Sequence, residues 1–219
     1  MYDLSGILDG TAVGTVRPGS SILVSGPAMA GGDDIAMETL SRGLERDQGA
    51  LVVSTNSNAT ETIEELAERT PELDRHRVAA IDCRADGGRE AETLDSGATV
   101  QHVASPANLT EIGIAITKSI ERLQDVGATE SRLALTSLST LITYTDRETV
   151  FKFCHVLSSR LDSAGFLGVF TIDASAHDEQ TMQVIKQTFD GIVELRERDG
   201  RREARVGGLQ PQPSDWVAL

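Results

Sequence analysis

Residues 20–34, with the sequence SSILVSGPAMAGGDD, have the outline of a phosphate-binding loop. Such a loop reads G-x-x-x-x-G-K-[ST]: backbone N–H groups surround the phosphates, the Lys reaches the β- and γ-phosphates, and the hydroxyl holds Mg²⁺. Gly26 and Gly31 keep this spacing and follow an apolar run that predicts a buried strand. However, Gly32 stands at the Lys position and Asp33 at the Ser/Thr position. The loop has therefore lost a cation and gained an anion where a polyphosphate would lie.

The candidate nucleotide-contacting residues are those of the altered loop. They are Gly26, Ala28, Met29, Ala30, Gly31, Gly32, Asp33 and Asp34. Backbone N–H groups of residues 28–32, together with the N-terminus of the following helix, could still bind an anion. Asp33 and Asp34 oppose this because they add negative charge at the same helix end. Both carboxylates can be interpreted as replacement metal ligands, but the favoured interpretation is that they are ordinary acidic residues in a first helical turn.

The charged residues of the chain argue against nucleic-acid binding. A net charge of −14 accompanies three lysines and seventeen arginines among the 20 basic residues. This balance is typical of proteins from halophiles that accumulate salt, where molar salt shortens the Debye length to about 3 Å. The acidity is therefore not taken as evidence for a basic partner. No predicted element carries a Lys/Arg stripe, so no nucleic-acid interface is expected.

The cysteines and histidines predict neither disulfide nor metal chemistry. Cys83 and Cys154 lie in apolar surroundings, which favours buried free thiols in a reducing compartment. The four histidines show no ligand spacing, and no metal site is expected. The sequence also lacks a long apolar run, a signal peptide and a lipidation motif. We therefore expect a cytoplasmic protein without membrane contact.

Strand-like and helix-like segments alternate along the whole chain, which predicts a mostly parallel sheet with helices on both faces. The expected strands are 22–25, 50–54, 77–82, 99–103, 132–138 and 166–172, followed by an edge hairpin of 191–195 and 203–206. The expected helices are 33–46, 61–69, 108–124, 146–163 and 178–188. Residues 87–97 are expected to form an acidic surface loop. We predict a single domain over 1–219, with a tail at 209–219.

The order of these motifs resembles the RecA-type ATPase domain, specifically its KaiC-like branch in archaea. Five segments carry the resemblance in addition to the loop. They are the phrase LSRGL at 40–44, the strand LVVST at 51–55, the Walker B-like strand RLALTSL at 132–138, and the closing strands at 168–172 and 190–195. The resemblance covers about residues 14–208 and implies a three-layer α/β fold of the RecA-like P-loop type.

The chain departs from this family at the positions that do the chemistry. Thr136 stands where the Walker B acid would hold Mg²⁺, and Asn56 and Ser57 stand where the family has its catalytic Glu pair. Neither side chain can act as a general base on water at neutral pH. Phosphoryl transfer needs a metal ion and cations that stabilise the developing charge. No catalytic residue is therefore assigned, and no cofactor is expected.

The resemblance implies two alternative functions. The first is a regulatory or signalling pseudo-ATPase that acts through a protein partner or a homo-oligomer, because RecA-type domains assemble through faces beside the nucleotide pocket. The second is an ATP-binding ATPase whose non-standard loop is completed by a partner subunit. DNA binding of the recombinase type ranks last, since the chain lacks a basic or aromatic platform for single strands. Trp216 and Tyr144 are the aromatic candidates for a partner surface.

Overall fold

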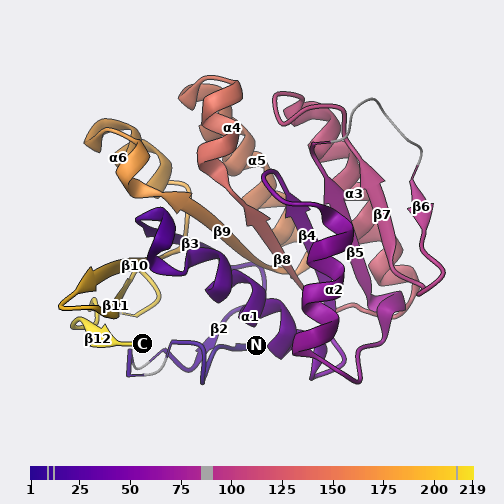
Figure 1. Cartoon of the computed structure of the whole chain (residues 1–219), viewed down its shortest axis with the longest axis horizontal. Helices are drawn as coiled ribbons and strands as arrows, with labels where there is room; N and C mark the ends of the chain where they lie inside the picture. The colour runs from indigo at the N-terminus through magenta and orange to yellow at the C-terminus, as the bar shows by residue number, and fades with distance from the viewer. Residues whose placement is uncertain (9, 12, 85–90, 211) are drawn as a thin grey trace.

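The computed structural model describes residues 1–8, 10–11, 13–84, 91–210 and 212–219 (Figure 1). Within these residues the strands form a ten-stranded sheet in the order β12-β11-β10-β3-β9-β8-β4-β5-β7-β6, and a separate two-stranded sheet of β1 and β2. The seven strands from β10 to β7 in this order run parallel to one another. The mostly parallel α/β architecture predicted from the sequence is therefore confirmed.

The strands are β1 (Tyr2–Asp3), β2 (Thr15–Val16), β3 (Ser21–Gly26), β4 (Gly49–Ser54), β5 (Val78–Asp82), β6 (Glu92–Thr93), β7 (Thr99–His102), β8 (Ser131–Thr136), β9 (Leu167–Asp173), β10 (Gly191–Arg198), β11 (Arg201–Gly207) and β12 (Val217–Ala218). The helices are α1 (Gly32–Leu44), α2 (Ala59–Arg69), α3 (Leu109–Asp125), α4 (Leu138–Tyr144), α5 (Arg147–Ala164) and α6 (Glu179–Lys186). Short 3₁₀ turns lie at η1 (Ala28–Ala30), η2 (Arg75–Arg77) and η3 (Ala174–Ala176).

Local capping residues fix the ends of several helices. Asn58 accepts a hydrogen bond from the backbone N–H of Thr60, and Asp146 accepts one from Thr149. At the start of α3, Asn108 Oδ1 accepts a hydrogen bond from the backbone N–H of Glu111, and Asn108 Nδ2 donates to Glu111 Oε2. Gly165 ends α5 in the left-handed conformation, with a φ of 72° that suits glycine. These signals explain why the observed boundaries lie close to those read from the sequence.

The helices form a layer on each face of the sheet (Figure 1). Helices α1 and α2 lie over one face, where their apolar residues share a core cluster with the N-terminal side chains of Tyr2, Leu4 and Ile7. Helices α3 to α6 contribute their buried residues to a second cluster on the opposite face. Tyr2 also binds the backbone at two distant points, since its hydroxyl donates to Gly165 O at 2.7 Å and accepts from Ser131 N at 3.1 Å.

Several boundaries differ from the prediction. The strand expected over 132–138 ends at Thr136, because Leu138 already begins α4, a helix that ends at Tyr144. The loop expected over 87–97 contains the short strand β6, which pairs with β7, while residues 85–90 lie outside the described residues. The predicted hairpin of β10 and β11 is present, but β12 from the C-terminal tail pairs with β11 and forms the outer edge of the sheet.

Candidate functional site

The altered loop connects β3 to α1 at the edge of the sheet where the parallel strands have their carboxyl ends. This is the edge at which open α/β sheets bind ligands. Gly31 precedes α1 with a φ of 85°, a left-handed conformation that glycine adopts without steric cost. Gly26 ends β3 against β10, where an added Cβ would lie 2.7 Å from Leu195 Cβ. Backbone conformation at Gly31 and close packing at Gly26 therefore explain why glycine stands at both positions, whether or not a ligand binds.

A small pocket of about 100 Å³ lies beneath this loop. Small-molecule sites usually have volumes of about 300–1,000 Å³, so the pocket is well below the size of a nucleotide site. Its lining residues come from the loop, from the strand ends and from β10: Gly26, Pro27, Ala28, Gly32, Asp33, Asn56, Ser137, Thr171, Ile172, Asp173 and Leu195. The buried residues Leu195 and Ile172 form the apolar part of this lining.

The pocket carries negative rather than positive side chains. Among the described residues that line it, Asp33 and Asp173 are the charged ones, and there is no Lys or Arg. Asp173 is held in place because its carboxylate accepts hydrogen bonds from the backbone N–H and the hydroxyl of Ser175. A polyphosphate in this pocket would face two like charges without a compensating cation.

The structure brings together some of the residues singled out in the sequence. Thr136, at the Walker B position, lies beside Asn56, at a catalytic-Glu position, with its Oγ1 3.5 Å from Asn56 Oδ1. The carbonyl of Thr136 also accepts hydrogen bonds from the backbone and the hydroxyl of Thr55. Ser57 instead faces α2, where its hydroxyl lies 3.3 Å from that of Thr62.

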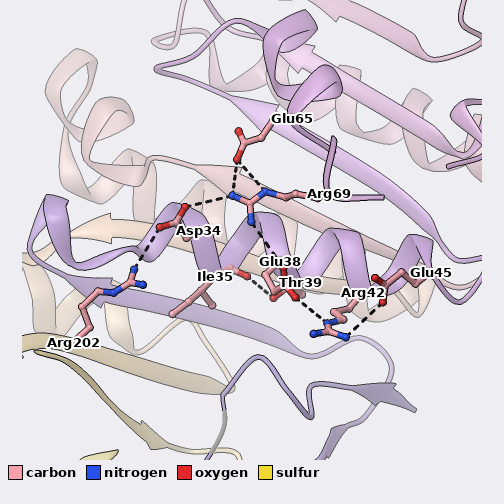
Figure 2. A network of polar contacts seen from close by, with 9 residues as sticks. All are labelled: Asp34, Ile35, Glu38, Thr39, Arg42, Glu45, Glu65, Arg69 and Arg202. Atoms are coloured by element: carbon pink, nitrogen blue, oxygen red, sulfur yellow. Dashed lines mark hydrogen bonds and ion pairs between the residues drawn. The ribbon is translucent and has the colours of Figure 1, made fainter. Parts of the chain in front are cut away.

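Other loop residues lie away from the pocket. Met29 is 88% exposed and Ala30 is buried in the core beside α1. Asp34 belongs to a polar network that joins α1, α2 and β11 (Figure 2). Its two carboxylate oxygens lie 3.5 Å from Arg69 Nη2 and 3.5 Å from Arg202 Nη1.

The network extends along α1 as a chain of ion pairs (Figure 2). Arg69 also pairs with Glu65 at 2.8 Å and Glu38 at 3.8 Å, and Glu38 in turn pairs with Arg42 at 2.8 Å. These side chains are about one third to two thirds exposed, so each pair contributes little to stability. The network fits the interpretation of Asp34 as a first-turn helix residue, since its charge is already paired by arginines of this chain.

A second polar contact that the sequence did not reveal joins α4 to the segment after β9. His177 Nε2 lies 2.8 Å from the hydroxyl oxygen of Ser139, and this oxygen also accepts the backbone N–H of Asp173 at 3.0 Å. Burial lowers the pKa of His177, although Asp173 and Asp178 act in the opposite direction. The neutral imidazole can accept the Ser139 proton, so the pair holds the Asp173 side of the pocket. Ser139 and His177 are 38 residues apart, and no local pattern around either residue indicates their contact.

Within the described ranges, no group of three or more His, Cys, Asp or Glu side chains is placed to hold a metal ion. None of the helices in that part of the chain combines the length and the apolar character that a membrane crossing requires.

Comparisons with known proteins place the chain in a family and a fold. The model of the Family of unknown function (DUF7504) matches residues 19–195. No curated protein matches the sequence. Among solved structures, the chain is similar to the KaiC-like protein PH0186 from the hyperthermophilic archaeon Pyrococcus horikoshii OT3, with a TM-score of 0.64, 13% identity, and coverage of 94% of this chain and 87% of that chain. At this identity the likeness shows the fold alone, which is RecA-like and KaiC-like. The match over most of its length shows that the chain belongs to the Family of unknown function (DUF7504).

Proposed function

We propose that this chain is a non-catalytic RecA/KaiC-like regulatory or signalling protein, a pseudo-ATPase that acts through association with protein. The observation that carries the proposal is the lining of the pocket beneath the loop. Asp33 and Asp173 stand there without a cation among the described lining residues, in a volume of about 100 Å³. Phosphoryl transfer depends on cations and Mg²⁺ at the developing charge, and this pocket offers the opposite charge.

The neighbouring positions support the same conclusion. Thr136 and Asn56 are neutral and lie beside each other, so neither a metal-binding acid nor a general base stands at these two places. Leu195 packs onto Gly26 and so narrows the space in which phosphates would lie. A single altered residue can be compensated by a neighbour, but here the cation, the hydroxyl, the acid and the base are all replaced.

The setting we propose is the cytoplasm, with the whole chain acting as one RecA-like unit. Cys83 and Cys154 are both buried free thiols. Burial raises the pKa of each thiol to about 12, which keeps it protonated and unreactive at neutral pH. Unpaired buried thiols are usual for proteins of a reducing compartment.

Restoring the missing groups tests the proposal. A Cβ at Gly32 would lie 3.6 Å from its nearest neighbour, Val24 Cγ1, so the backbone accommodates a Gly32→Lys change. We expect Gly32→Lys combined with Asp33→Thr to gain affinity for ATP–Mg²⁺ in calorimetry, relative to the unchanged chain. Met29→Lys is the control, because it adds a lysine to the same loop at an 88% exposed position outside the pocket. Equal ATP affinity in all three proteins would show that the lost groups do not decide binding.

A second candidate function is ATP binding completed by another subunit, and one observation favours it. The guanidinium group of Arg202 lies against Gly31, so this chain does place a cation beside the loop. That cation is paired with Asp34 at 3.5 Å, which competes with an incoming phosphate. If this candidate is correct, ATP affinity will appear only at protein concentrations at which light scattering detects an oligomer.

A further inference from the structure

The outer surface of helices α3 and α5 contains an open groove of about 700 Å³. The two helices lie side by side on the face of the sheet opposite α1 and α2 (Figure 1). The groove is therefore separate from the pocket beneath the altered loop. Its volume lies within the range of about 300–1,000 Å³ that is typical of binding sites.

The floor of the groove is apolar and accessible. Ile114 on α3 is 52% exposed and Val156 on α5 is 68% exposed, and both line the groove with the half-buried Phe153. These are two of the few large hydrophobic side chains that the described residues expose. Exposed apolar side chains gathered in one concave place mark an interaction site more often than scattered ones do.

The rim of the groove is basic, although the chain has a net charge of −14. Lys118, Lys152 and Arg160 line it, and they include two of the three lysines in the sequence. Within the described part of the chain, neither lysine forms an ion pair, and Arg160 has only a distant partner, Glu121, at 3.9 Å. No carboxylate is among the described lining residues. The groove thus combines an apolar floor with unneutralised positive charge.

The shape of the groove fits a helix. The α5 residues that line it run from Thr149 to Arg160, which at about 1.5 Å per residue covers about 16 Å, or about three helical turns. Gly113 lies on α3 between these walls, and a Cβ added there would meet no atom within 4 Å. Small residues at such a place allow a partner backbone to approach closely, as in helix-in-groove recognition.

We propose that the α3/α5 groove binds an acidic amphipathic helix of a partner protein. Leucine-like side chains of that helix would cover Ile114 and Val156, while its Glu and Asp residues would meet Lys118 and Lys152. A symmetric pair of copies is a poorer occupant, because the same cations would face each other across the two-fold axis. The acidic helix α2 of a second copy is also unsuitable, since its apolar residues Ile63 and Leu66 are fully buried within its own chain. This inference rests on the proposed function, to which it adds the association surface and the chemistry of the partner.

A designed peptide tests the groove directly on the full chain. The probe is a helical peptide of about 18 residues with Leu at positions i, i+3, i+4 and i+7 and Glu on its flanks; the control replaces each Glu with Lys. We expect calorimetry to detect binding of the acidic peptide only, and amide NMR shifts to map to α3 and α5. Lys118→Glu and Lys152→Glu together should weaken binding at least about tenfold. Arg198→Glu, at the exposed end of β10, should leave it unchanged.

A second variant separates groove filling from loss of charge. Gly113→Trp should abolish peptide binding because its side chain occupies the groove, whereas Gly113→Ala should retain it. Absence of peptide-induced shifts in α3 and α5 would overturn the proposal, as would light scattering that shows self-association blocked by Gly113→Trp. These results are independent of nucleotide chemistry. If the peptide binds and ATP is hydrolysed, the pseudo-ATPase function is overturned and the groove proposal stands. If the peptide does not bind and ATP is not hydrolysed, the groove proposal alone is overturned.

Discussion

Leu195 lies directly against Gly26, so that a Cβ on Gly26 would be 2.7 Å from Leu195 Cβ and 2.9 Å from its carbonyl oxygen. This contact joins the first glycine of the altered phosphate-binding loop to the neighbouring strand β10. The glycine is therefore required by packing, whether or not a nucleotide binds. It also explains how the spacing of the motif persists in a chain that has lost the groups that contact phosphate.

Replacing Gly26 with Ala is expected to destabilise the protein. The added methyl group overlaps backbone as well as side-chain atoms of Leu195, and overpacking of this kind costs about 1–3 kcal/mol. Urea unfolding followed by circular dichroism measures the change. The control is Gly113→Ala, which meets open space in a helix and should stabilise the protein by about 0.5–1 kcal/mol. Equal midpoints for the two variants would refute this packing account.

Gly43 and Arg132 form a second coupled pair. Arg132 is fully buried, and its guanidinium donates to Gln48 Oε1 at 2.8 Å and to Thr39 O at 2.9 Å. Burial lowers the pKa of Arg132 to about 10. A Cβ on Gly43 would lie 2.8 Å from Arg132 Cδ and Nε, so the glycine of the LSRGL phrase leaves room for this side chain.

A double-mutant cycle should detect this coupling. Arg132→Ala alone removes buried hydrogen bonds and leaves a cavity, at a cost of about 3–5 kcal/mol. Gly43→Ala alone should destabilise the protein, but the same change should cost little once Arg132 is Ala, with a coupling energy of about 0.5–3 kcal/mol. Chemical denaturation of the four proteins gives this value. Additive effects would mean that Gly43 and Arg132 do not constrain each other.

The elements could be predicted from the sequence because their signals are local. Asn58, Asn108 and Asp146 each precede a helix and accept a backbone N–H from its first turn, and Gly165 ends α5. Contacts between distant segments left no such signal. The pairing of Asp34 with Arg202 spans most of the chain, and the part that Leu195 plays in closing the pocket depends on the register of β10 against β3.

The same reasoning explains the errors at strand ends. Leu138 follows the apolar strand residues after only Thr136 and Ser137, so the pattern alone could not show that Leu138 is buried as part of a helix. The strand β12 is only two residues long, which is too short for a strand pattern in the sequence. It forms because the C-terminal tail lies against β11. Ile114 and Val156 lie outside the buried apolar sets of α3 and α5, so the core pattern of the two helices did not reveal the α3/α5 groove.

Protonation of His177 should destabilise the protein as pH falls. Burial lowers its pKa in the folded state, whereas the unfolded chain keeps a value of about 6.5. The unfolded state therefore takes up a proton first, and stability decreases from about pH 6.5 down to the folded pKa. We expect His177→Gln to lose this part of the pH dependence of urea unfolding. NMR titration of the His177 ring giving a pKa above 6.5 would contradict the assignment.

Trp216 should report on docking of the C-terminal tail. It is the single tryptophan of the chain, and its ring centre lies 3.9 Å from Arg196 Cζ and 4.9 Å from Arg205 Cζ. Such cation–π contacts contribute about 0.5–1 kcal/mol each at exposed sites. Arg196→Ala should therefore shift the Trp216 emission to longer wavelength before global unfolding begins. An unchanged spectrum in this variant would show that the arginine does not hold the tail.

The most direct measurement of the central claim is titration of the unchanged protein with ATP and Mg²⁺ in molar KCl, combined with an assay for released phosphate. The acidic pocket predicts no heat of binding at micromolar ATP and no phosphate release above that of buffer. The same preparation should retain its folded circular dichroism spectrum, so that a negative result belongs to the folded chain. Micromolar binding with turnover would contradict the pseudo-ATPase account.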